Sequence, residues 1–141
     1  MSKLVNAAVV YRGPSKLDRM PIVAILTGMR GDSSNPKTGG IAQLWILRDD
    51  MHPQEALATG QDISICGDCI HRGADGGART CYVLMFAPGA IWNCDKRGGY
   101  PPMSPRDAGR ILADQRVEVR LGAYGDPAAL PVPVLRDLLH D

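Results

Sequence analysis

Four cysteines are the residues of this chain best suited to specific chemistry. Cys66 and Cys69 form a Cys-x-x-Cys pair, and Cys81 and Cys94 follow. Two thiolates at this spacing can turn toward one ion, and the intervening Gly67 relaxes the backbone between them. Zinc in structural sites takes four nitrogen or sulfur ligands in a tetrahedron. The pattern therefore predicts a zinc site, with an iron–sulfur cluster as the alternative cofactor.

Three ligands are predicted to be Cys66, Cys69 and Cys81, and the fourth is either Cys94 or His71. The stretch 71–80 is rich in glycine and polar residues, with hardly any apolar side chain to anchor it. A bound metal would hold such a loop where packing cannot. The alternative is that Cys81 and Cys94 are small buried apolar residues and the pair holds no ion.

A second polar loop, 33–40, combines hydroxyl groups, an amide, a lysine and two glycines before an apolar segment. Glycine gives access to backbone N–H groups and lysine supplies a cation, as phosphate binding requires. The glycine spacing is not that of a P-loop. If the two long loops meet, their polar and basic residues form a patch for phosphate or nucleic acid: Ser33, Asn35, Lys37, Thr38, Arg72 and Arg79. The alternative is a solvated turn.

Asp126 is the carboxylate best placed for acid–base work, because it follows a predicted strand and such positions line the crevice of open α/β sheets. A Gly-Asp-Pro turn that caps the last helix is the competing interpretation. The three histidines, His52, His71 and His140, have no partner that the sequence assigns. No nucleophile–base pair is thus predicted.

The 141 residues carry a net charge of +1 and are 45% hydrophobic, which excludes a polybasic or an acidic disordered chain. Glycine and proline together number 16 + 11 = 27, so many loops are expected. No apolar run approaches the roughly 20 residues of a membrane span. The first residues lack the apolar core of a secretory signal. We therefore expect a cytoplasmic protein with reduced thiols and no membrane contact.

Hydrophobic periodicity predicts one metal-binding α/β domain over residues 1–141, built on a small mixed sheet. Ser104, Pro105 and Asp107 form the strongest helix start. The segment 63–65 is short and apolar, and a long loop is expected to open at Cys66. Strands are expected at 5–11, 21–26, 41–47 and 117–121, and helices at 53–58, 88–96, 105–114 and 133–139.

The last predicted helix has no strand after it, so the unit resembles an α/β architecture, such as a barrel, cut short. The strand at 117–121 is then expected at an open edge, with the Val134, Leu135 and Leu138 face partly uncovered. Open edges pair with other chains. We expect a homodimer, or docking on another protein, to cover this surface.

Several motifs resemble those of a family of uncharacterised, Cys-rich proteins encoded by bacteriophages: SSNPKTGGIAQLWIL, CGDCIHR, RTCYV and RLGAYGDPAA. The resemblance covers residues 22–140 and the N-terminal part of the longer family members, which look like α/β barrels or half-barrels. Cys66, Cys69, His71 and Cys81 match the family pattern. Cys94 falls where a different residue is expected, so the resemblance favours His71, or a group from outside the chain, as the fourth ligand.

The functional hypothesis is a phage-type zinc-binding module without chemistry of its own. It would engage nucleic acid or a host protein, for host takeover or inhibition of a defence, in the cytoplasm of the infected cell. The alternative is an enzyme that modifies nucleic-acid bases, or a remnant of one, with a metal or iron–sulfur site. In that case the metal, Lys37 and Asp126 would surround one crevice.

Overall fold

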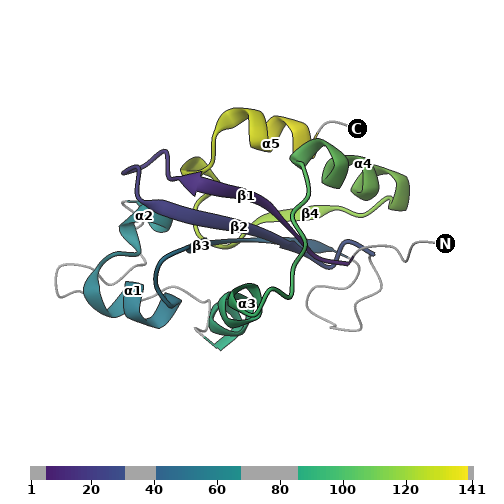
Figure 1. Ribbon diagram of the computed structural model, residues 1–141. Helices are drawn as coiled ribbons and strands as arrows, with labels where there is room; N and C mark the ends of the chain where they lie inside the picture. Colours follow the sequence, from purple (N-terminus) through teal and green to yellow (C-terminus); the bar gives the residue numbers. More distant parts are fainter. Residues whose placement is uncertain (1–5, 31–40, 68–85, 140–141) are drawn as a thin grey trace.

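A four-stranded mixed sheet forms the centre of the protein (Figure 1). The computed structural model describes residues 6–30, 41–67 and 86–139. Within them the strand order is β1-β2-β3-β4, antiparallel for the first two pairs and parallel for β3 and β4. The sheet is open and does not close into a barrel. The strands are β1 (Ala8–Pro14), β2 (Pro21–Thr27), β3 (Ala42–Arg48) and β4 (Val119–Tyr124).

Helices cover both faces of this sheet, so the predicted α/β class is confirmed. Figure 1 shows α1 and α3 on one side and α4 and α5 on the other. The parallel connection from β3 to β4 passes through α1 to α4. The helical elements are α1 (Pro53–Thr59), α2 (Ile63–Cys66), α3 (Phe86–Lys96), α4 (Pro105–Gln115), the 3-10 turn η1 (Pro127–Ala129) and α5 (Val132–Leu139).

The two central strands are apolar on both faces because both faces are covered. Ile22 to Leu26 of β2 are completely buried, and so are Leu44, Ile46 and Leu47 of β3. Trp45 also lies in the core, where its indole N–H donates to Thr27 Oγ1 at 3.0 Å. A continuous apolar run, rather than alternation, is thus the sequence pattern of these two strands.

The start of α4 is as predicted. Ser104 Oγ accepts a hydrogen bond from the backbone N–H of Asp107 at 3.1 Å, and Pro105 occupies the first turn. These contacts satisfy one of the unpaired N–H groups at a helix start. Gly109 is buried in the same helix where α4 approaches α5, and a Cβ there would collide with the backbone carbonyl oxygens of Asp137 and Leu138.

Three predictions about local structure are corrected. The first strand runs over Ala8–Pro14, later than the predicted 5–11. Residues 63–66, expected to be a short apolar stretch opening a loop, form the helical turn α2. The last strand begins at Val119 and ends at Tyr124, later than the predicted 117–121, because its partner β3 sets the register through Ala42–Val119 and Trp45–Tyr124.

The expected exposure of the last helix is also wrong for its main apolar residues. Val134 and Leu138 are buried in the core, and Leu135 is packed against it. The reason is that α4 and α5 pack against each other, with Gly109 allowing the close approach. β4 is the last strand in the order of the sheet, as the expected edge position requires.

Candidate functional site

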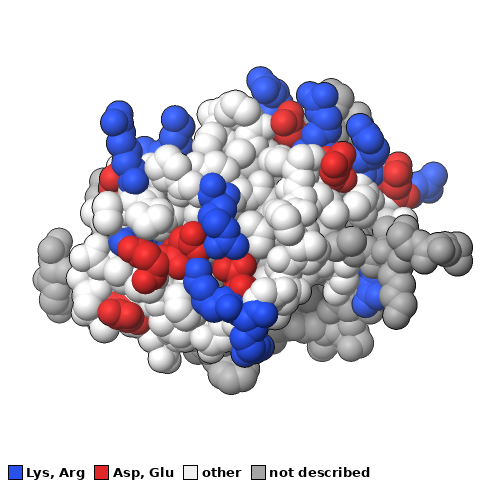
Figure 2. All heavy atoms as spheres, in the orientation of Figure 1, with Lys and Arg blue, Asp and Glu red and all other residues white. Residues whose placement is uncertain are grey.

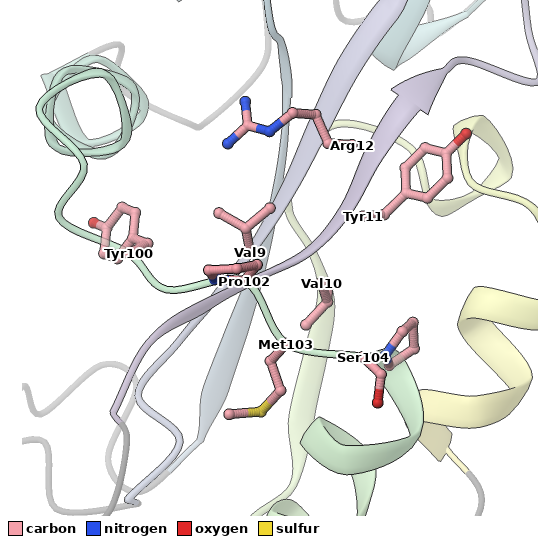
Figure 3. A pocket seen from close by; sticks show the side chains of 9 residues that line it. Val9, Val10, Tyr11, Arg12, Tyr100, Pro102, Met103 and Ser104 are labelled. Atoms are coloured by element: carbon pink, nitrogen blue, oxygen red, sulfur yellow. The ribbon is translucent and has the colours of Figure 1, made fainter.

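A groove of about 630 Å³ runs along the outer edge of β1 (Figure 3). One wall is formed by four consecutive residues of the strand, and the other by the connection from α3 to α4. Two tyrosine rings, two prolines and a methionine make the lining largely apolar. The lining residues are Val9, Val10, Tyr11, Arg12, Tyr100, Pro102, Met103, Ser104 and Pro105.

The groove exists because the connection pairs with β1 at one point only. Val9 donates its N–H to Pro101 O at 2.8 Å, and its carbonyl accepts from Met103 N–H at 2.9 Å. Beyond Val9, a bulge at Val10 changes the register of β1 against β2. Bulges bend a strand and increase its twist. The two segments therefore diverge and leave the space between them.

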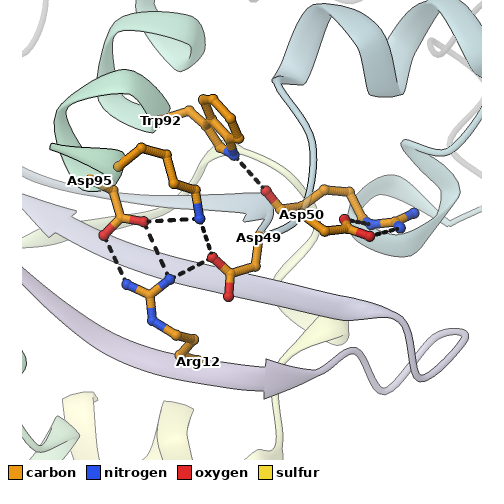
Figure 4. Close-up of polar contacts among 7 residues, drawn as sticks. Arg12, Asp49, Asp50, Trp92 and Asp95 are labelled. Carbon is orange, nitrogen blue, oxygen red and sulfur yellow. Dashed lines mark hydrogen bonds and ion pairs between the residues drawn. The ribbon is translucent and has the colours of Figure 1, made fainter. Parts of the chain in front are cut away.

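Arg12 lies at one end of the groove in a cluster of opposite charges (Figure 4). Its guanidinium contacts Asp49 at 2.5 Å and Asp95 at 2.8 Å, and Lys96 contacts Asp49 at 2.5 Å. The hydrogen bond with Asp95 is the main cause that raises the pKa of Arg12. The cluster joins β1, the end of β3 and α3, so it holds the Arg12 side chain in place at the groove.

Tyr100 supplies a second polar group to the groove. Burial raises the pKa of its phenol, and a hydrogen bond with Cys94 adds to the effect. Tyr100 is therefore a neutral hydrogen-bonding group at physiological pH. Cys94, on α3, is half-buried and lies near the Tyr100 phenol.

A second polar network lies beneath α2 and was missed by the sequence analysis. Arg48, at the end of β3, is 1% exposed and makes two hydrogen bonds of 2.9 Å with the Asp50 carboxylate (Figure 4). It also donates to Ser64 Oγ at 3.2 Å, and Ser64 Oγ donates to Asp18 at 2.6 Å. In the sequence, the only local sign of this network is an arginine followed by aspartates after an apolar strand.

This network fixes the position of Cys66. The thiol is at the last residue of α2, half-buried and packed against the core. Ser15 Oγ donates to Ser64 O, and Asp126 N–H donates to Ile65 O, which secures the two preceding residues. Gly67 follows with a positive φ of 56° and turns the chain away.

The other predicted metal ligands, Cys69, His71 and Cys81, lie outside the described residues. The same holds for the predicted phosphate contacts Ser33, Asn35, Lys37, Thr38, Arg72 and Arg79. Among the residues that the structure does describe, no three His, Cys, Asp or Glu side chains gather closely enough to hold a metal. Cys66, at the end of α2, and Cys94, on α3, therefore belong to no such group within the described residues.

Asp126 serves a local structural purpose. Its Oδ1 accepts from Ala128 N–H at 2.9 Å and caps η1, immediately before α5. His52 is likewise a cap, because its Nδ1 accepts from Gln54 N–H at the start of α1. Both side chains therefore accept hydrogen bonds that cap the start of a helical element.

Charges on the face seen in Figure 2 are interleaved. Basic and acidic side chains alternate at its centre, over the end of β1 and α3, and along α4 and α5, where Arg106 and Arg136 lie near Asp137. A second cavity, of about 400 Å³, lies between α4, α5 and the start of β4. In the described part of the chain, no helix has the length and apolar character needed to cross a membrane.

A scan of family models finds none that matches the chain, and searches of curated proteins and of solved structures likewise find no match.

Proposed function

We propose that the protein is a small α/β binding module, of the phage type that its motifs resemble, whose second long loop is held by one zinc ion. It engages a partner in the cytoplasm of an infected cell and carries out no chemistry of its own. The placement of Cys66 supports this proposal most directly, because this half-buried residue belongs to an anchored turn at the point where the Cys-rich segment begins.

A ligand held in advance lowers the entropic cost of closing a metal site. Cys66 is held by Arg48 and Ser15 through Ser64, and Cys69 follows three positions later in the sequence. Cys66, Cys69 and Cys81 would hold the ion. The family resemblance, which Cys94 does not match, favours His71 as the fourth ligand. When bound, zinc would cross-link Cys66 to the segment that contains the other proposed ligands.

Binding is favoured over catalysis by the roles of the described polar side chains. His52 and Asp126 cap a helix and a 3-10 turn, and Arg48, Asp49 and Asp95 belong to ion-pair networks. The groove beside β1 offers aromatic rings and a fixed guanidinium, which are typical of recognition surfaces. A host protein or nucleic acid is the partner that the phage resemblance implies.

Metal analysis of the purified full chain, with a visible spectrum, tests the proposal. We expect a colourless protein with one zinc per chain. Cys66→Ser, Cys69→Ser and Cys81→Ser should each lose the metal and melt at a lower temperature, whereas Cys94→Ser, the matched control, should keep it. A brown protein would show an iron–sulfur cluster instead. Full zinc and unchanged melting in all three variants would refute the site.

A further inference from the structure

We propose that the groove beside β1 binds an extended peptide that adds to the edge of this strand and carries an acidic side chain next to an apolar one. The inference rests on the proposed function, since it names the partner of the module and the surface that binds it. It concerns residues remote in sequence from the predicted zinc ligands, so the two proposals can fail separately.

The backbone of β1 supplies the first argument. Val9 directs its N–H and carbonyl away from β2, toward Pro101 and Met103, which shows that this edge accepts a parallel partner. Side chains normally alternate between the two faces of a strand, and the bulge at Val10 delays this alternation by one residue. Figure 3 accordingly shows Val9 and Arg12 on one side of β1, with Val10 and Tyr11 on the other. Arg12 is therefore the next residue with outward backbone groups.

Those outward groups of Arg12 lie at the groove. Among the described residues, no backbone hydrogen bond outside the strand ladders uses the N–H or carbonyl of Arg12. Proline at positions 101 and 102 removes two N–H donors from the connection, which limits its own pairing with β1. Because Val9 is already paired with the connection, the open part of this edge runs over Val10 to Arg12, a length of about 10 Å at the usual rise of an extended chain. This matches a short extended segment.

The charge of the rim supplies the second argument and selects an acidic guest. In the ion cluster the cations are outermost: the side chains of Arg12 and Lys96 are 44% and 34% exposed, against 21% for Asp49 and 3% for Asp95. Of these charged residues only Arg12 lines the groove, so an incoming carboxylate meets its guanidinium there. The apolar floor, with Met103 and the ring of Tyr100, suits the neighbouring apolar side chain.

The experiment selects binders for the full chain from a displayed library of random short peptides and measures a fluorescein-labelled selected peptide by anisotropy. We expect the selected sequences to pair an acidic with an apolar residue. N-methylation of alternate amides in the peptide should weaken binding by about tenfold or more, because it removes strand hydrogen bonds. Arg12→Gln should weaken binding similarly, whereas the matched surface control Arg136→Gln should not.

A measurement on the wild-type chain covers the case in which Arg12→Gln fails to fold. Peptide binding should shift the NMR signals of the Val9 to Arg12 amides and slow hydrogen exchange at Arg12. Absence of any selected binder, shifts located elsewhere, or an N-methylated peptide that binds equally well would overturn the inference. An oligothymidylate that shifts these amides while no peptide does would assign the groove to nucleic acid. Zinc analysis of the same sample reports separately on the metal-stapled module.

Discussion

Arg48 is a buried cation on which the surroundings of α2 depend. Its side chain satisfies Ser64 and Gln61 and forms a bidentate pair with Asp50. We expect Arg48→Met to lower the free energy of unfolding by about 3 kcal/mol, because buried polar groups lose their partner. Urea unfolding measures this, with Arg110→Met on the exposed side of α4 as the control. Equal effects of the two substitutions would contradict it.

The pair with Arg48 also predicts a dependence on pH. The hydrogen bond from Arg48 is the main cause that lowers the pKa of Asp50. A carboxyl group whose pKa is lower in the folded state stabilises the fold above its unfolded pKa, about 4. That contribution is lost as the pH falls through the folded value. Acid titration of stability should therefore show a shallower loss below about pH 4 in Asp50→Asn than in the wild type. Parallel curves would contradict the assignment.

At the level of single elements, α4 depends on its first residue. Ser104→Ala removes the side-chain acceptor for Asp107 N–H and is expected to lower the free energy of unfolding by about 1 kcal/mol. Ser104→Asp keeps an acceptor at the cap and adds a charge that suits a helix start. It should therefore retain stability. Thermal and urea unfolding of both variants check this, and a loss of the same size in both would show that the cap is unimportant.

The packing of α4 against α5 reverses the usual preference for alanine in helices. Alanine is favoured over glycine by about 1 kcal/mol in a helix interior. At position 109 a Cβ would meet the backbone of α5, so Gly109→Ala should instead destabilise the fold by about 1–2 kcal/mol net. Ala113→Gly, at an exposed position of the same helix, should also destabilise it, by about 1 kcal/mol. A higher free energy of unfolding in Gly109→Ala would contradict this expectation, because it would show that α5 shifts to make room for the Cβ.

For the whole molecule, the fold should survive removal of the proposed zinc ion. One apolar core draws on all four strands and on α2, α4 and α5. Chelation should therefore lower the melting temperature while the far-ultraviolet circular dichroism keeps its shape. Complete loss of secondary structure with the metal would mean that the core depends on the zinc site for folding.

The edge of the sheet leads to an expectation about assembly. β4 ends the strand order, and a cavity with apolar lining lies where it begins. Symmetric pairing of this edge would cover the surface in both copies at once. We expect sedimentation velocity to show twice the chain mass of 15.2 kDa, and Val119→Lys, which places a charge on the edge, to shift the protein to monomer. A monomeric wild type that captures no protein in pull-downs would refute this expectation.

The sequence alone determined the features that depend on neighbouring residues. The apolar runs of β2 and β3 and the cap at Ser104 follow from local periodicity and backbone preference. Such signals extend over a few residues, so they were readable without a structure and identified the α/β class. They also identified the Cys-rich segment as the candidate for metal binding.

Only the tertiary structure determined the groove and the two polar networks. Arg12 meets Asp95 across 83 positions, and Val9 meets Pro101 at a similar separation. The register of β4 depends on β3, and the burial of Val134 depends on α4. Contacts between distant segments arise from how elements pack, and no local pattern in the chain encodes them. Recognition surfaces of this kind are therefore visible only after folding brings their walls together.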